Sequence, residues 1–222
     1  GKLRYCLWLK ECPEDIMSSC DKLIVRLKNV ANIRSNSTKE LTRKWALKPH
    51  LFTEDRQPDM EYLMLPVVSS EKRQYIPMAY IDSTVIANTN SQMIPDAPIY
   101  VFGVLTSLIH SVWMKAVCGR LEMRFAYSAS VVYNTFPFPS ISDTKKSEIE
   151  EAATNVLLAR ENYPEKTLAD LYDPEKMPED LRAAHEELDA IVESCYSDAP
   201  FPNDEARLEC LFKLYEKMTA NK

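Results

Sequence analysis

Glycine is scarce in this sequence, with only three among 222 residues. Loops that hold phosphates through backbone N–H groups, as in P-loops, dinucleotide folds and S-adenosylmethionine sites, need several glycines close together. Gly1, Gly103 and Gly119 are instead far apart. The sequence therefore argues against a nucleotide-dependent catalytic site within these residues, and it predicts no catalytic residue and no cofactor held by the chain itself.

Metal-binding patterns of cysteine and histidine are also missing. The six cysteines form no Cys-x-x-Cys pair, and the three histidines lie far from them in sequence. No metal site is predicted. We expect free thiols in a reducing cytoplasm, most of them buried as small apolar side chains.

Long apolar runs and targeting segments are absent as well. The longest apolar stretch, 97–112, is interrupted by Ser107 and His110, so no membrane-spanning helix is predicted. Residue 1 is glycine rather than methionine, and no signal peptide follows it. We expect a soluble, cytoplasmic fragment of a larger protein, with no membrane partner.

Charge is unevenly distributed around a net value of −6. Residues 1–140 contain 17 Lys and Arg against 13 Asp and Glu, a net charge of +4, whereas residues 141–222 contain 10 against 20, a net charge of −10. The first region could meet a phosphate backbone that the second would repel. The acidic region has two open interpretations, a solvated helical face or a surface for a protein partner.

The pattern predicts an α+β fold, beginning with a buried strand over residues 4–9. A helix follows Pro13 and runs to about Asn29, because apolar residues recur there at helical spacing. Ser37 and Glu40 have the spacing of a capping box, which predicts a second, basic helix that stops at Pro49. Short β-prone segments at 62–68, 75–81 and 84–87 then predict a small antiparallel sheet.

The remainder predicts one long buried helix over 97–117, then strand, turn and strand over 121–136. The extended segment 136–139 marks a boundary. Beyond it, helical patterns at 147–162, 178–196 and 203–218 are separated by proline-containing connections. We therefore predict two domains, an α+β domain over 1–140 and an acidic all-α segment over 141–222.

One predicted strand carries a charged pair. If residues 121–127 form a single strand, Glu122, Arg124 and Ala126 share one face, while Met123 and Phe125 share the other. In a DNA major groove, Arg can bond to guanine while a neighbouring Glu accepts from cytosine. By spacing alone, the pair fits a simple surface ion pair better than a base-reading pair.

Several short motifs together resemble the target recognition region of MmeI-type restriction–modification enzymes. These single-chain enzymes join an endonuclease, an N6-adenine methyltransferase and a DNA-reading domain. The resemblance covers nearly the whole chain in the family's order: 4–9, 68–77, 102–107, 119–121 leading to 127–139, and, for the helical C-terminal segment, 167–174, 177–178 and 184–189.

The resemblance implies a DNA sequence-recognition module that binds double-stranded DNA and presents an adenine to the catalytic domains of the same parent chain. It implies that Glu122 and Arg124 read one base pair, with Ala126 and Asn90 as further readers. It also implies S-adenosylmethionine and Mg²⁺ as cofactors of the parent's other domains. Candidate phosphate contacts are the basic residues Arg34, Arg43, Lys44, Lys72, Arg73 and Arg120.

Neither catalytic motif of such an enzyme is predicted here. No Asn-Pro-Pro-aromatic motif of an adenine methyltransferase occurs. The one acidic-x-Lys triplet downstream of a Pro-Asp dipeptide, 143–145, lies in the linker between the predicted domains rather than on a strand. The alternative function is a protein-interaction module whose acidic helices bind a partner, without DNA readout.

Overall fold

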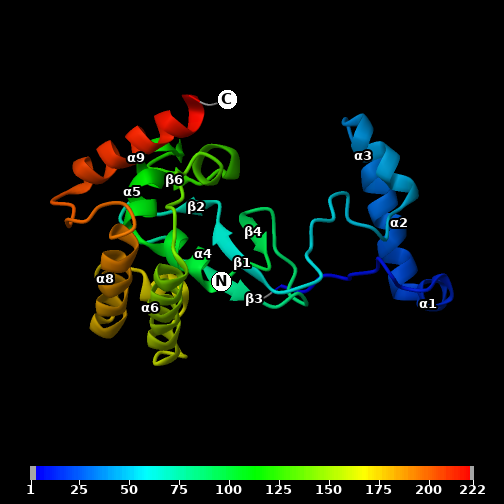
Figure 1. The fold of residues 1–222 in the computed structure, drawn as a ribbon. Helices are drawn as coiled ribbons and strands as arrows, with labels where there is room; N and C mark the ends of the chain where they lie inside the picture. Colours follow the sequence, from blue (N-terminus) through cyan, green and yellow to red (C-terminus); the bar gives the residue numbers. More distant parts are fainter. Residues whose placement is uncertain (1–3, 221–222) are drawn as a thin grey trace. The chain divides into compact units, whose positions relative to one another are not determined.

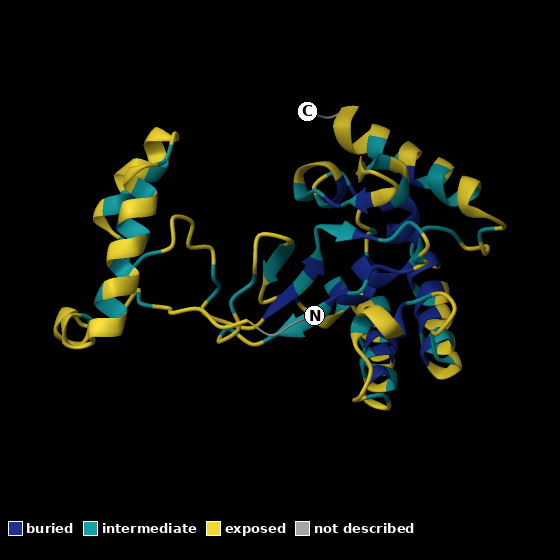
Figure 2. Cartoon of the chain, turned by 180° about the vertical axis from the view of Figure 1, so that it is seen from behind, coloured by how far each residue is buried: buried dark blue, intermediate teal, exposed yellow. Residues whose placement is uncertain are grey.

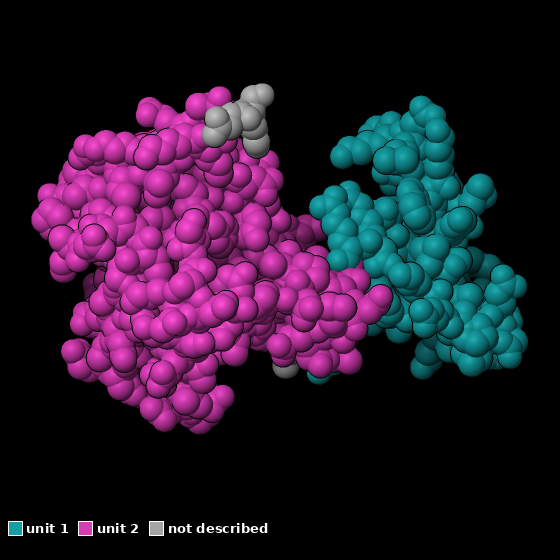
Figure 3. All heavy atoms as spheres, in the orientation of Figure 1, with its two compact units in different colours: residues 1–56 teal, residues 57–222 magenta. Residues whose placement is uncertain are grey.

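The computed structural model describes residues 4–220 of the chain. The chain forms two compact units, residues 1–56 and 57–222 (Figure 3). The helices of residues 141–222 belong to the second unit because they pack on the same hydrophobic core as its sheets.

The first unit is helical (Figure 1). It contains α1 (Glu14–Ser19), α2 (Asp21–Ser35), α3 (Glu40–Lys44) and a 3₁₀ turn (Trp45–Leu47). Leu23, Leu27 and Val30 share the inner face of α2, yet none of the described side chains in this unit is fully buried (Figure 2).

Two sequence predictions for this unit were wrong. Residues 4–9 form no strand, because no other strand lies among residues 4–56 to pair with them, and Tyr5 is 94% exposed. The predicted capping box does not form either, since the Ser37 side chain accepts a hydrogen bond from the Lys39 amide and Glu40 is already the first helical residue. The predicted first helix is divided at Cys20 and extends to Ser35.

The second unit contains two small antiparallel sheets, which confirms the predicted α+β class. One has the order β3 (Ala79–Ile81), β1 (Tyr62–Pro66), β4 (Ser91–Pro95), and the other has the order β2 (Val68–Ser69), β6 (Arg124–Ala126), β5 (Gly119–Leu121).

Two strand predictions were wrong in detail. The predicted strand over 62–68 is divided at Val67, with one part in each sheet. Residues 84–87 form no strand, because the Asp82 carboxylate accepts from the Thr84 amide at 2.8 Å and turns the chain.

The predicted long helix is two helices, α4 (Ile99–Thr106) and α5 (Leu108–Val117), which meet at a 59° bend. Ser107 causes the break, since its backbone is extended, with ψ at 161°. Within residues 4–220 no single helix is long and apolar enough to cross a membrane, and only the bent α4–α5 pair, taken together, reaches that length and hydropathy. A π-helical turn, Ala129–Tyr133, replaces the predicted second strand over 121–136.

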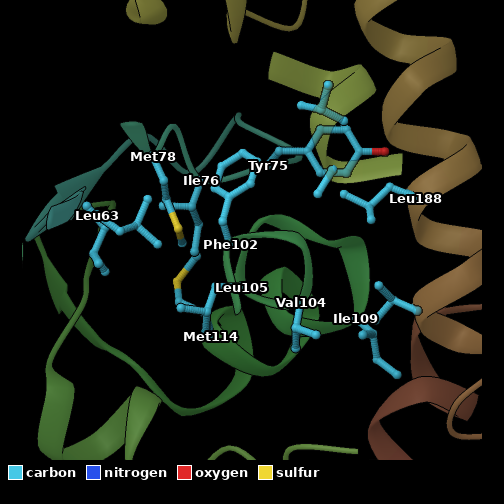
Figure 4. Packing of buried hydrophobic residues seen from close by; sticks show 14 of the residues in the cluster. Leu63, Tyr75, Ile76, Met78, Phe102, Val104, Leu105, Ile109, Met114 and Leu188 are labelled. Carbon is cyan, nitrogen blue, oxygen red and sulfur yellow. The ribbon is translucent and has the colours of Figure 1, made fainter. Parts of the chain in front are cut away.

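The three predicted C-terminal helices are confirmed as α6 (Asp143–Glu161), α8 (Glu179–Glu193) and α9 (Asp204–Ala220), with a short α7 (Leu168–Leu171) between the first two. Helices α6 and α8 pack on α4, where Phe102, Val104 and Leu105 are buried in the same core as residues from the strands and α8 (Figure 4). The close approach of α4 to α6 requires Gly103, because a Cβ there would lie 2.7 Å from Ile149 Cγ2.

The cysteine predictions are confirmed in part. All six cysteines are free, but Cys6 and Cys20 are exposed and the other four are half-buried. The prediction that most of them are buried was therefore wrong.

Candidate nucleic-acid interface

The proposed reading pair lies on a β-hairpin rather than on a single strand. In its register Gly119 faces Ala126, Arg120 faces Phe125 and Leu121 faces Arg124. Glu122 lies in the connecting turn, with φ at 57°, a left-handed conformation that suits a tight turn. The prediction of one continuous strand over 121–127 was wrong.

The two faces of this hairpin differ sharply in burial. Phe125 is 5% exposed and belongs to the core, whereas Arg124 is exposed and Ala126 is partly exposed. Cross-strand partners point to the same face, so Leu121, 50% exposed, lies beside Arg124. Leu121 was not among the predicted site residues, and Met123, predicted on the apolar face, is 71% exposed in the turn.

Glu122 and Arg124 form the ion pair that their spacing allowed. Arg124 Nη2 donates to Glu122 Oε2 at 3.0 Å, and the two side chains are 48% and 78% exposed, respectively. An ion pair this exposed contributes at most about 1 kcal/mol to stability. The pair therefore presents an Arg donor fork beside a carboxylate acceptor, with little cost in stability if a ligand separates them.

Backbone hydrogen bonds bring Asn90 close to the hairpin. The Val67 amide donates to the Asn90 carbonyl at 2.9 Å, and the Tyr127 amide donates to the Val67 carbonyl at 2.7 Å. Asn90 and Tyr127 thus flank one extended segment, about 10 Å apart at two strand spacings. That distance corresponds to about three base steps of a duplex, at 3.4 Å each. Asn90 therefore lies two strand spacings from the end of β6, the strand that carries Arg124 and Ala126.

A buried histidine anchors the hairpin to α5. His110 Nδ1 lies 2.6 Å from the Leu105 carbonyl, and Tyr127 Oη lies 3.3 Å from His110 Nε2. Burial lowers the pKa of His110 to about 4, so the ring is neutral at pH 7. A neutral ring that donates from Nδ1 can accept from Tyr127 at Nε2. The strand end next to Ala126 is therefore fixed to the helical core.

The C-terminal helices are joined to the same core through a buried carboxylate. Asp189 on α8 accepts from the Leu108 amide and from the Tyr75 hydroxyl, each at 2.7 Å. It thereby satisfies an N-terminal amide of α5, directly after the bend. Burial raises the pKa of Asp189 to about 7.

A second buried group of polar side chains lies between α6, α7 and α8. Arg160 donates to the Met78 carbonyl at 2.7 Å and to the Tyr172 hydroxyl, which also lies 2.7 Å from His185 Nε2. Thr167 and Asp170 form a capping box that starts α7 just before Tyr172. The motif over 167–174 is thus explained by packing and capping.

The three phosphate candidates of the second unit differ in availability. Lys72 is exposed, and its ammonium makes no ion pair with the described residues. Arg73 donates to the Ala169 carbonyl at 3.3 Å and is half-buried. Arg120 lies over the Phe125 ring at 4.1 Å, on the hairpin face opposite Arg124. Of the three, Lys72 has the most accessible charge.

The three candidates of the first unit also differ. Arg34 donates to the carbonyls of Trp45, Lys48 and Leu51 at 2.8 to 3.0 Å, so its guanidinium holds that loop against α2. Arg43 Nη1 donates to two carbonyls at the start of α3. Lys44 forms an exposed ion pair with Glu40 on the same helix.

Residues 4–220 bring together no group of three His, Cys, Asp or Glu side chains that could hold a metal ion. The buried carboxylate at Asp189 is already occupied by two protein donors. The described side chains therefore do not fit a Mg²⁺ site, and three isolated glycines do not fit an S-adenosylmethionine loop.

Comparison with known proteins defines the family. Residues 1–140 match the MmeI target recognition domain and residues 141–221 match the MmeI C-terminal domain. The chain therefore belongs to the MmeI family, as its target recognition and C-terminal domains.

Two larger proteins are similar to it over nearly its whole length. DNA methyltransferase A of Bacillus subtilis (strain 168) is 44% identical over 219 residues, which are 99% of this chain and 25% of that protein. A solved structure of the type IIL restriction–modification enzyme MmeI in complex with DNA matches with a TM-score of 0.94 and 42% identity, covering 97% of this chain and 29% of that one. The chain thus spans less than a third of either relative.

Proposed function

We propose that this chain is the DNA sequence-recognition module of a restriction–modification enzyme with N6-adenine methyltransferase and endonuclease activities. One observation carries the proposal: Arg124 and Ala126 are accessible on β6, the central strand of the second sheet, while Phe125 and Tyr127 are buried in the core beside them. Asn90 lies next to the segment that pairs with the end of this strand. The solved MmeI structure with DNA, of the same fold, supports duplex DNA as the ligand.

In this proposal Glu122 and Arg124 read one base pair in the major groove. Arg124 would donate to guanine O6 and N7, while Glu122 would accept from the cytosine amino group, with discrimination of about 1 to 3 kcal/mol. Asn90 and Ala126 would face neighbouring base pairs. Lys72, Arg43 and Lys44 are proposed phosphate contacts, whereas the bonds of Arg34, Arg73 and Arg120 favour a role in holding the fold.

The parent chain would supply the chemistry. Its methyltransferase and endonuclease domains are the proposed partners within the same chain, and S-adenosylmethionine and Mg²⁺ are assigned to those domains. We place the enzyme in the bacterial cytoplasm, where its duplex substrate lies. The role of the present residues is to bind the site and position the target adenine.

The test is a genome-wide map of methylated adenine in cells that make the full-length parent or its Glu122→Lys/Arg124→Asp variant. We expect a discrete motif that changes at one base pair in the variant. The matched control is Glu54→Lys/Arg56→Asp, because these residues form a similar exposed ion pair at 2.8 Å. The control should leave the motif unchanged.

Two other results would contradict parts of the proposal. An identical motif in the Glu122→Lys/Arg124→Asp variant would remove the reading role from this pair. No methylation by the folded parent would favour the alternative, a protein-interaction module that uses its acidic helices. That alternative rests on 20 Asp and Glu in residues 141–222.

A further inference from the structure

Positive charge in this chain is concentrated in the first compact unit. Residues 1–56 contain 12 Lys and Arg against 7 Asp and Glu, a net charge of +5. Residues 57–222 contain 15 against 26, a net charge of −11. The net charge of the second unit, which contains the hairpin of residues 119–126, therefore opposes association with DNA, and cations of the first unit would offset that repulsion.

Some cations of the first unit already have partners within it. Lys10 pairs with Asp55 at 2.6 Å, and Arg34 is bound to backbone carbonyls. In contrast, Lys22 and Arg26 on α2 make no ion pair or side-chain hydrogen bond with any of the described residues. Their charge remains available to a ligand.

Lys22, Arg26 and Asn29 lie on the outward face of α2. Their spacing of four and three residues places them one above another on a helix, and all three are exposed, whereas Leu23, Leu27 and Val30 face inward. Together with Asp21 and Val25 they line a shallow surface depression. Leu23, Leu27 and Val30 instead line a hollow against residues 5–9 and 49–52, which Arg26 also borders. The exposed charges of Lys22 and Arg26 are therefore free to meet a charged ligand.

We infer that this α2 face, Lys22, Arg26 and Asn29, binds the phosphate backbone of duplex DNA and supplies affinity without reading sequence. This inference rests on the proposed function. A duplex carries one negative charge per about 1.7 Å of its axis, so it complements two cations one helical turn apart. Arg26 and Asn29 supply planar N–H donors, and Lys22 supplies a mobile point charge.

The experiment compares the full-length parent with its Lys22→Gln/Arg26→Gln variant. Equilibrium binding is measured between 50 and 200 mM salt on a duplex that contains the methylated motif and on one that lacks it. Each phosphate contact contributes about 0.9 to the slope of log K against log salt, so the variant should reduce the slope by about 2 on both duplexes. The methylated motif should stay the same.

The matched control is Lys176→Gln/Lys213→Gln, which removes two cations from the C-terminal helical region. Both lysines are exposed and are paired with nearby carboxylates, Asp173 and Glu209, respectively. The control should leave the slope unchanged. A slope that is equal in the parent and the Lys22→Gln/Arg26→Gln variant would overturn the inference, as would a change of motif, which would mean that α2 reads bases.

Different results would refute the proposed function and the α2 inference. If the unmodified parent binds both duplexes equally and methylates no motif, the proposed function fails. If the parent keeps site preference and the α2 variant keeps the full salt slope, only the α2 inference fails.

Discussion

The buried carboxyl group of Asp189 makes the free energy of unfolding fall as pH rises from about 4 to about 7. Burial raises its pKa from 3.8 to about 7. The folded state therefore binds this proton more tightly than the unfolded state, so the stabilisation present below pH 4 is lost as pH rises to about 7. At 1.36 kcal/mol for each unit of pKa, the change is on the order of 4 kcal/mol.

Asp189→Asn removes this titration and keeps the shape of the side chain. Its oxygen can still accept from the Leu108 amide, and its NH₂ can donate to the Tyr75 hydroxyl, which then acts as acceptor. We expect the variant to match the wild type near pH 4 and to exceed its stability by an amount that grows to pH 7. The measurement is urea unfolding of residues 1–222 at a series of pH values.

The control is Asp170→Asn, for which the sign is opposite. Hydrogen bonds from Thr167 lower the pKa of Asp170, so this carboxylate stabilises the fold at neutral pH and the benefit is lost as pH falls. The wild type should therefore exceed Asp170→Asn most clearly at neutral pH. Parallel stability curves for wild type and Asp189→Asn between pH 4 and 7 would refute the assignment of a raised pKa.

Three other results are expected. Gly103→Ala should lower the urea midpoint, because overpacking against Ile149 costs about 1 to 3 kcal/mol and exceeds the gain of about 1 kcal/mol in helix propensity; a raised midpoint would contradict the tight packing. Arg34→Lys should speed proteolysis within 45–51, since one ammonium cannot bridge three carbonyls, and an unchanged cleavage rate would refute this role. Cys6 and Cys20, being exposed, should react first with a thiol reagent, so prior labelling of the half-buried cysteines would contradict the structure.

The C-terminal helices were predictable because apolar residues recur there at helical spacing between prolines. Residues 62–68 were not, because the run is apolar throughout and no residue type marks Val67 as the point where the chain passes from one sheet to the other. Ser107 likewise breaks a helix only because its extended backbone is stabilised by contacts that are distant in sequence, such as Asp189 with Leu108. Periodicity reports the buried face of an element and not its tertiary partners.

In the candidate site, too, the sequence pattern predicted the buried face of an element but not its tertiary partners. Alternation correctly placed Arg124 and Ala126 on one face with Phe125 on the other, but it could not show that Glu122 and Met123 form a turn. The proximity of Asn90 to the hairpin depends on two backbone hydrogen bonds through Val67, and backbone pairing between distant segments leaves no sequence pattern. The reading roles themselves came from the family resemblance.

On the hairpin, the residues that hold the fold differ from the residues proposed to read DNA. Phe125 and Tyr127 are 5% and 4% exposed and anchor the strand, whereas the Glu122–Arg124 ion pair is exposed and worth at most about 1 kcal/mol of stability. The same pair could discriminate between base pairs by about 1 to 3 kcal/mol, or roughly 5- to 150-fold. Substitutions at these two positions should therefore change specificity far more than stability, so that new reading pairs can be placed on an unchanged scaffold.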